Sequence, residues 1–334
     1  MNNEGKQSDI ISYIKGPGLQ KVIAISALII LYLFFGIFGQ NFFSSDTLVS
    51  IFDSSYYTGF MAIGITFVLL TGGIDLSIGT VAVGSALVGG VAYNIWKMPI
   101  GLCLLVILGV AIAFGFANGL MIGKLGLPPF IATLGTQFMS LGLCSVIANV
   151  QTMRYPKITD QDGWFKVVFF KTRSGFPMGA VWLAVFFIIA YVLLTKTRLG
   201  RYTYAIGSNE EAVRLSGINV SNWKVIIYTL CGTFSGLAGI IYAATYTSIT
   251  PQTGNGLEMY AIASCVIGGT SLAGGIGSLS GTIIGLFVIN VLKNGLMSMS
   301  LPVQWQTFFI GLVVVIAVLL DVIRAKRAKM VKKV

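Results

Sequence analysis

The chain has 334 residues, of which 55% are hydrophobic and only 10% are charged, and its mean hydropathy is +0.86. Soluble domains carry about 25% charged residues, so a single soluble core is excluded. The formal net charge is +11, but the basic residues gather in loops and tails, where membrane topology explains them better than nucleic-acid binding. Histidine, the commonest general base and metal ligand, is absent from the sequence. We therefore expect an all-α, polytopic helical membrane protein with no nucleic-acid partner.

Ten apolar runs predict about ten membrane segments. They cover residues 22–39, 55–70, 76–93, 99–122, 129–150, 177–195, 223–246, 259–271, 278–297 and 303–321. No small-residue cleavage site follows the first run, so we expect it to remain as a helix rather than to be removed as a signal peptide. The glycine-rich stretch between residues 55 and 93 also fits a broken or re-entrant pair. Four cysteines lie inside apolar runs, at no metal or disulfide spacing, and are expected to be small core residues: Cys103, Cys144, Cys231 and Cys265.

Lysine and arginine are distributed unevenly between the two sides of these ten segments. Fifteen lie on the side that holds both termini, and seven lie on the other side. Because basic loops stay in the cytoplasm, this difference predicts that both termini are cytoplasmic. The chain then divides into a cytoplasmic N-terminal segment (1–21), a membrane domain (22–321) and a basic cytoplasmic tail (322–334), with an external loop at 151–176 and a cytoplasmic loop at 196–222.

The external loop at 151–176 carries Tyr155, Trp164 and Phe165 among its charges. Aromatic residues of this kind anchor segments at the membrane interface. Two interpretations stay open for this stretch: a solvated loop held by interfacial anchors, and a surface that receives an external partner.

The polar stretch at 196–224 separates two long apolar runs, and its middle predicts a short helix. Ser208 or Asn209 can cap the start of this helix, and Gly217 ends it. Glu210 and Glu211 fall in its first turn, where the helix dipole favours anions. A helix of two turns is too short to be stable alone, so we expect it to dock on its own membrane domain or on a soluble partner.

Asp75, in the run TGGIDLSIG, is the carboxylate that the sequence places within or against the hydrocarbon region. A charge there costs at least about 2.5–3.5 kcal/mol, so an acidic residue in this position suggests a functional site. The structural alternative is favoured, because Gly72 and Gly73 indicate a turn after which Asp75 caps the segment that begins at Leu76. Both readings predict that the side chain matters.

A second glycine cluster, VIGGTSLAGGIGSLSG, contains Gly268 and Gly269. It is not a phosphate-binding loop, because no lysine lies between Lys224 and Lys293 to reach a phosphate. Such a density of small residues favours close helix packing and is also compatible with a hinge. The pair Gly72 and Gly73 resembles Gly268 and Gly269, which weakly suggests an internal repeat. Without a phosphate loop or a soluble domain, the chain is not expected to be an enzyme, and any energy for transport must enter through a partner.

Polar side chains also occur within the apolar runs. They can line a hydrophilic pathway or join helices by hydrogen bonds, and the sequence does not separate these two roles. The candidates are Asn118, Gln137, Asn290, Asn294, Gln304, Trp305 and Gln306.

Four ordered blocks of the sequence carry a resemblance to a known family. The blocks TGGIDLSIG, NGLMIGKLGLPPFIATLGT, GRYTYAIGSNEEAVRLSGINV and AIASCVIGGTSLAGGIGSLSGTIIG resemble the permease subunits of bacterial ATP-binding cassette importers for ribose and related simple sugars. The resemblance spans about residue 45 to the C-terminus. It implies about ten helices in a multi-pass protein of the inner membrane and a second permease copy, either identical or paralogous. It also implies a cytoplasmic ATPase that holds ATP and Mg²⁺, and a periplasmic or lipid-anchored sugar-binding protein, with no cofactor in this chain.

The resemblance further implies which residues contact the ATPase. The family carries an EAA-x3-G pattern, which Glu211, Ala212 and Gly217 match here, whereas Val213 departs from it. The implied coupling residues are Ser208, Asn209, Glu210, Glu211, Ala212, Arg214 and Gly217. Tyr260 stands where many relatives carry aspartate, which puts a close match of substrate or of binding-protein contact in doubt. The expected cargo is a monosaccharide, and nucleosides, furanosyl compounds similar to autoinducers and branched-chain amino acids are the alternatives.

Overall fold

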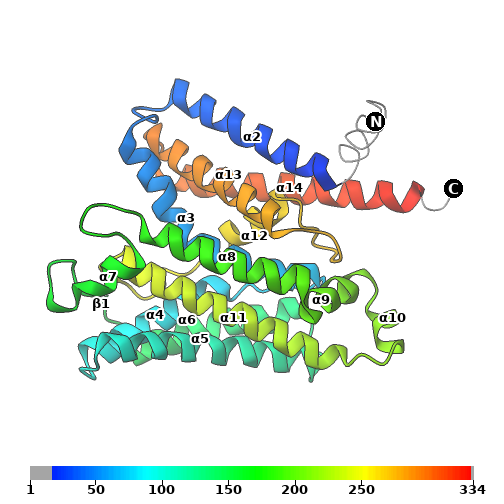
Figure 1. Ribbon diagram of the computed structural model, residues 1–334, viewed down its shortest axis with the longest axis horizontal. Helices are drawn as coiled ribbons and strands as arrows, with labels where there is room; N and C mark the ends of the chain where they lie inside the picture. Colours follow the sequence, from blue (N-terminus) through cyan, green and yellow to red (C-terminus); the bar gives the residue numbers. More distant parts are fainter. Residues whose placement is uncertain (1–16, 332–334) are drawn as a thin grey trace, which may run out of the picture.

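The computed structural model describes residues 17–331, and thirteen α-helices make up most of this part of the chain (Figure 1). Ten of them correspond to the ten predicted segments. They are α2 (Pro17–Phe38), α3 (Ser45–Leu70), α4 (Ile78–Asn94), α5 (Ile100–Gly123), α6 (Pro129–Ile147), α8 (Met178–Lys196), α11 (Val220–Thr245), α12 (Leu257–Ile267), α13 (Leu279–Ser298) and α14 (Val303–Val331). The predictions for residues 1–16 and 332–334 lie outside the described residues.

Six of these helices are both long enough and apolar enough to cross a membrane: α2, α5, α6, α8, α11 and α13. The apolar helices α4 and α12 are shorter, and the apolar part of α14 covers Val303–Leu319. Helix α3 begins at Ser45, ten residues before the predicted segment, because the Ser44 side chain caps it by accepting the Thr47 N–H at 3.3 Å. Helix α14 continues to Val331, so the basic residues that we assigned to a separate tail extend the last helix.

The prediction that residues 259–271 span the membrane is wrong. Helix α12 has 11 residues, which corresponds to about 16 Å, roughly half of the hydrocarbon thickness. It ends at Ile267 because the glycine-rich loop 268–278 follows. Helices α3 and α4 are likewise separated by a non-helical loop at 71–77. This loop confirms the predicted break in the first glycine-rich stretch.

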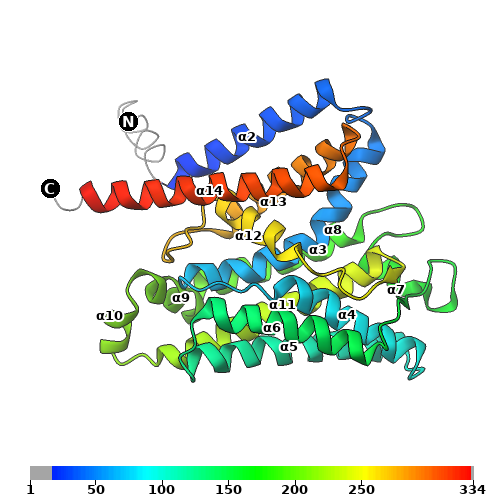
Figure 2. The same ribbon diagram turned by 180° about the vertical axis from the view of Figure 1, so that it is seen from behind.

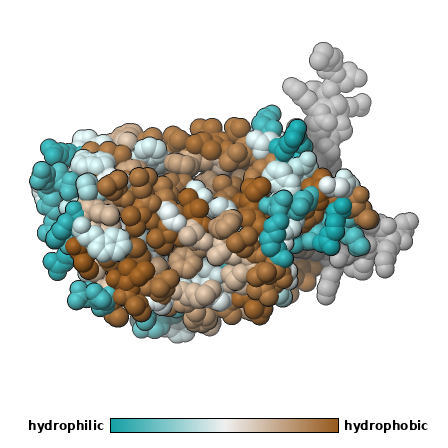
Figure 3. Space-filling view, turned by 90° about the horizontal axis from the view of Figure 1, so that it is seen from below, coloured by the Kyte–Doolittle hydropathy of each residue, from teal (hydrophilic) through white to brown (hydrophobic). Residues whose placement is uncertain are grey.

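The core lies between α3, α4 and α11, whose side chains bury one another, and α13 packs against α3 and α12. Helices α2, α5, α6, α8 and α14 form the outside and expose large apolar residues. Figure 3 shows a broad apolar band with polar residues gathered at both ends of the molecule. An exposed apolar band of this kind is expected where lipid is the solvent.

One end of the band, which we call the α7 end, is closed by a small folded cap. Residues Met153–Arg154 (β1) pair antiparallel with Ser248–Ile249 (β2), and η1 (Gln161–Gly163) leads into α7 (Trp164–Phe169). Tyr155 and Phe165 are buried, at 3% and 0% exposure. The expectation that they are interfacial anchors is therefore wrong, because they fill the space beneath the cap, whereas Trp164 remains exposed.

The opposite end, which we call the α10 end, carries the two short helices α9 (Arg198–Ser208) and α10 (Glu210–Leu215). Figure 1 shows that α2 starts and α14 ends at this same end of the molecule. The first described residue of α2, Pro17, and the last of α14, Val331, therefore lie on the same side as the 196–222 loop. The free cysteines Cys103, Cys144, Cys231 and Cys265 are all buried, as expected.

Candidate functional site

The polar stretch 196–222 folds into two helices rather than one. Ser208 is the last residue of α9, and Asn209 is the cap of α10, with its Oδ1 accepting the Ala212 N–H at 3.0 Å. Gly217 follows α10 with a φ of +83°, a left-handed conformation that favours glycine. The sequence did not reveal α9, whose turns bury Thr203 and Ile206 beneath a mostly polar surface.

Helix α10 is held to the protein by one face and leaves the other face free. Val213 is buried with Ile206 and Val220 in a small apolar cluster. Leu215, in contrast, is 84% exposed. The remaining exposed residues on and directly after α10 are Glu211, Ala212, Arg214, Ser216 and Gly217. The helix therefore presents a mixed polar and apolar surface that is available to a partner.

Glu210 makes two ion pairs, of which the pair with Lys224 fixes α10 to α11 and the pair with Arg214 lies within α10. Its Oε2 lies 2.8 Å from the Lys224 Nζ in α11, and its Oε1 lies 2.9 Å from the Arg214 Nη2. Partial burial raises the pKa of Glu210, but hydrogen bonds and charges from Lys224 and Arg214 outweigh it and hold the pKa below its ordinary value. Among the side chains that the structure describes, Glu211 has no ion-pair partner.

Beside α10 lies an open cleft with a volume of about 710 Å³. It is lined by Glu210 and Arg214 on one side and by the loop between α5 and α6, including Gly126 and Pro128, on the other. The cleft leaves α10 without close support on that side, so this helix has room to shift relative to the bundle.

The end of α9 packs directly against the end of α3 and against the glycine-rich loop 268–278. A Cβ at Gly207 would overlap the Leu70 carbonyl oxygen and would lie 2.5 Å from the Gly275 nitrogen. The Gly275 N–H donates to the Leu70 carbonyl at 2.9 Å, and the Tyr204 hydroxyl donates to the Gly277 carbonyl at 2.8 Å. The loops 71–77 and 268–278 thus meet each other at the base of α10, although they are separated by about 190 residues in the sequence.

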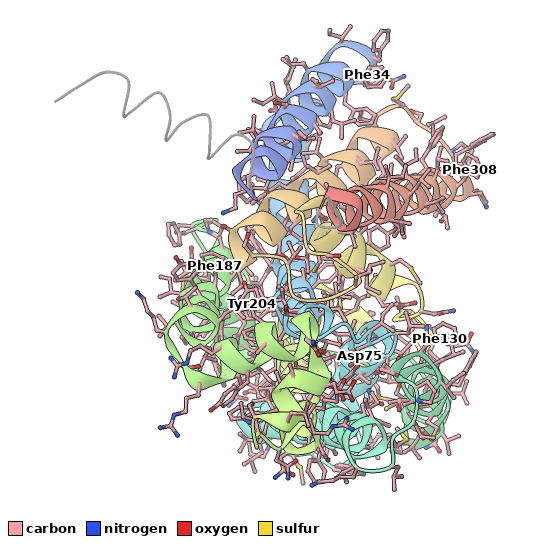
Figure 4. All side chains as sticks on the ribbon, turned by 90° about the vertical axis from the view of Figure 1, so that its right-hand side faces the viewer. Phe34, Asp75, Phe130, Phe187, Tyr204 and Phe308 are labelled. Atoms are coloured by element: carbon pink, nitrogen blue, oxygen red, sulfur yellow. The ribbon has the colours of Figure 1, made fainter. Side chains whose placement is uncertain are left out.

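Asp75 lies within the loop 71–77 and is 2% exposed. Its Oδ1 accepts the Ser77 N–H at 2.9 Å and the Ser77 hydroxyl at 2.6 Å. The Asn118 Nδ2 donates to the Ser77 hydroxyl at 2.9 Å, and the Thr136 hydroxyl donates to the Asn118 Oδ1 at 2.5 Å. This chain joins α4, α5 and α6 through buried hydrogen bonds. Figure 4, seen from the α10 end, shows Asp75 and Tyr204 near the centre of the molecule.

The glycines of the two loops serve turns and close packing. Gly72 has a φ of +77° and approaches the Ala273 carbonyl, while a Cβ at Gly73 would press on the Tyr228 hydroxyl. A Cβ at Gly268 would overlap the Gly281 carbonyl of α13, and Gly269 adopts a positive φ at the turn. Close packing between α12 and α13 therefore requires Gly268.

The other predicted polar residues do not form one pathway. Asn290 and Asn294 are buried in α13, where the Asn290 Nδ2 bonds to the Leu286 carbonyl and the Asn294 Nδ2 bonds to the Asn290 carbonyl and the Ser54 hydroxyl. Gln304 and Trp305 are exposed at the start of α14, at the α7 end, and Gln306 bonds to the Leu301 carbonyl. The structure brings together Asp75 with Asn118, and it places Gln137 elsewhere, beside α12.

Sequence reasoning missed one buried carboxylate. Glu258 is 3% exposed at the start of α12, where it accepts a hydrogen bond from the Gln137 Nε2 at 3.0 Å. The expected segment began at residue 259, so Glu258 was assigned to a loop. The signal that could have identified it is the preceding run Gly254, Asn255 and Gly256, because Gly256, with a φ of +89°, directly precedes α12.

Comparisons with known proteins agree on one family. A family model described as "Branched-chain amino acid transport system / permease component" matches residues 47–318. The chain is 37% identical over 317 residues to the ribose import permease protein RbsC of Escherichia coli (strain K12), covering 92% of this chain and 96% of the relative. It is 39% identical over 306 residues to RbsC of Bacillus subtilis (strain 168), covering 91% and 93%.

A relative with another printed cargo is almost as similar. The chain is 35% identical over 299 residues to the autoinducer 2 import system permease protein LsrC of Yersinia pestis (strain Pestoides F), covering 89% of this chain and 83% of the relative. No solved structure matches the chain. ATP binds to the partner ATPase of such importers, and the permease carries no cofactor and is not itself catalytic. The chain therefore belongs to the family of multi-pass permease components of ATP-binding cassette importers, which work with an ATPase and a binding protein.

Proposed function

We propose that this permease carries a monosaccharide of the ribose type across the bacterial inner membrane. Support comes from the ribose import permeases, which match more than 90% of this chain at 37% and 39% identity. A periplasmic or lipid-anchored binding protein delivers the sugar to the α7 end. Two permease copies, identical or paralogous, enclose the pathway.

The α10 end faces the cytoplasm in this proposal. The excess of lysine and arginine on the side of both termini supports this orientation, and α10 lies at the same end as the start of α2 and the end of α14. Single cysteines at Asp160 and Ser208, in a cysteine-free variant, test it. An impermeant maleimide is expected to label them from opposite sides of the membrane. Labelling from one side would overturn the assigned orientation.

Energy enters through α10 when the ATPase closes. The observation that carries this step is the contact of the end of α9 with the end of α3 and with the loop 268–278, through Gly207, Leu70 and Gly275. A push on the exposed face of α10, which has an open cleft beside it, displaces α9 and thereby the loops that join α3 to α4 and α12 to α13. Such a displacement rocks the two halves between outward and inward access.

A furanosyl compound similar to autoinducer 2 is the second candidate cargo, because the LsrC relative is 35% identical. Direct uptake of labelled ribose, galactose, nucleosides, leucine and autoinducer 2, each measured with the intact importer, separates the candidates. We expect ribose to be taken up fastest. Uptake of autoinducer 2 alone would transfer the proposal to that cargo, and failure of every sugar to be taken up would contradict it.

A further inference from the structure

Helix α12 begins in the interior of the membrane domain rather than at its edge. The chain leaves α11 at Thr245, pairs briefly as β2 and continues without helix until Leu257. Gln137 gives the depth of this break, because it is the ninth of the 19 residues of the spanning helix α6 and therefore lies near its middle. Its Nε2 donates to the Glu258 Oε1 at 3.0 Å and lies 3.4 Å from the Asn255 Oδ1. The start of α12 thus lies near the midplane of the membrane.

This break is not covered by the rest of the chain. Gln252, Thr253 and Asn255 are exposed, although Gly254 packs closely on Gly79 of α4. Figure 2 shows α12 on one face of the molecule between α14 and α6, and Figure 4 shows Phe308 of α14 and Phe130 of α6 on the two flanks of that face. Irregular backbone at this depth is not tolerated against lipid, but it is tolerated where it is buried in protein or lines a water-filled cavity. Because Gln252, Thr253 and Asn255 are exposed rather than buried in the described chain, the break indicates an aqueous pathway along this face.

The side chains at the break offer both donors and acceptors. The Glu258 carboxylate accepts the Gly256 N–H at 3.2 and 3.1 Å and the Gln137 amide N–H. The ion pairs among the described side chains all join other residues. A carboxylate has about four acceptor positions, so Glu258 retains capacity for a further donor. Asn255 uses its Oδ1 in the contact with Gln137, and its Nδ2 has no acceptor among the described residues.

This arrangement selects a class of ligand. Neighbouring hydroxyls of a neutral molecule can donate to Glu258 and accept from Asn255 at the same time, whereas an anion is repelled by the Glu258 carboxylate and an apolar molecule leaves the polar groups unpaired. We propose that Gln137, Asn255 and Glu258 form a cargo-binding site at the midplane, specific for a neutral polyhydroxylated molecule. The proposal rests on the proposed function, since it names the residues that contact the sugar during passage.

The test compares single-deoxy analogues of ribose in the intact importer, reconstituted with its ATPase and binding protein. Uptake of ribose and of each analogue is measured for the wild type, Asn255→Ala, Glu258→Gln and Gln137→Leu. Because the binding protein is the same in every preparation, its own preferences cancel in the ratio of variant to wild type. Asn255 is exposed, so Asn255→Ala keeps the test decisive if a variant of the buried Glu258 folds poorly.

We expect Asn255→Ala and Glu258→Gln to lower ribose uptake roughly ten- to one-hundred-fold. The loss is expected to be much smaller for the one analogue that lacks the contacted hydroxyl. Damage to structure alone would lower uptake of all analogues by the same factor, and that result would overturn the site. Gln40→Leu and Asp46→Asn, at exposed positions near the α7 end, serve as controls. Their uptake of ribose and of every analogue is expected to equal that of the wild type. A wild type that carries no sugar would contradict the proposed function instead, before any variant is compared.

Discussion

The α10 end and the midplane break are both polar features of an apolar chain, yet they are built differently. Helix α10 is defined by adjacent residues, with Asn209 at its start and Gly217 at its end. The break at α12 joins Gln137 to Glu258, more than one hundred residues later. A surface that receives a partner can be specified locally, whereas a site inside the membrane draws its donors and acceptors from several helices because the surrounding lipid offers none.

The same comparison explains how the two regions are connected. The glycine loop 268–278 follows directly after α12 and touches α9 through Gly275 and Gly277. Movement of α10 thus reaches the midplane through α9, this loop and the 11 residues of α12. Substitutions at Gly207, Asp75 and Glu210 disturb α9, the 71–77 loop and α10, respectively.

Gly207→Val is expected to have the largest effect. A Cβ there overlaps the Leu70 carbonyl, and because that atom belongs to the backbone the packing has to open. Overpacking of this kind costs about 1–3 kcal/mol or more. We expect a lower melting temperature in detergent and loss of uptake. Gly109→Ala, where an added Cβ meets nothing within 4 Å, is the control. Normal uptake by Gly207→Val would show that α9 and the loops move independently.

Asp75→Leu is expected to have the next largest effect. It removes the acceptor of the Ser77 N–H and hydroxyl, and a buried polar group left unpaired costs about 1–3 kcal/mol. We expect loss of folding or of transport, measured as purified yield and uptake. Asp75→Asn retains a side-chain oxygen and is expected to keep partial function. Wild-type uptake by Asp75→Leu would contradict both a structural and a transport role for this carboxylate.

Glu210→Gln is expected to have the smallest effect, because its ion pairs with Lys224 and Arg214 are partly exposed. Such pairs contribute little, so hydrogen exchange of residues 209–217 should quicken roughly two- to five-fold at pH 7. The lowered pKa of Glu210 means that its contribution is complete above the ordinary value of 4.5 and is lost as the pH falls through the folded-state pKa. The difference between wild type and Glu210→Gln should therefore vanish in strong acid. Identical exchange at pH 7 would show that these pairs do not hold α10.

Most of the fold follows from the sequence, because apolar runs of about twenty residues leave few alternatives to spanning helices. Two features do not follow from such runs. Helix α12 lies within an apolar run that continues into the glycine loop, so hydropathy alone overestimates its length at residues 259–271. Tyr155 and Phe165 are aromatic residues of the kind that anchors segments at the membrane interface, and only the folded structure shows that they are buried under the cap.

The candidate site likewise has features that the sequence predicted and features that it did not. The cap, the first-turn acids and the terminal glycine of α10 were predicted from local chemistry. The contact of Gly207 with Leu70 and Gly275 was not predicted, because the sequence does not show which residues pack against a glycine. Asp75 was identified by its charge, while Glu258 was missed because the predicted segment began at residue 259, two residues after the start of α12.

The central claim is that energy enters at α10, and the double variant Glu211→Lys with Gly217→Val tests it most directly. The first change reverses the charge of an exposed acid, and the second places a branched side chain at a φ of +83°, where it is penalised by about 1 kcal/mol or more. Membrane insertion, co-purification of the ATPase and uptake are measured in one preparation, beside the control Lys196→Glu. We predict normal insertion, weakened co-purification and no uptake. Normal uptake by the double variant would contradict the account, because α10 would then not be the point at which the ATPase drives transport.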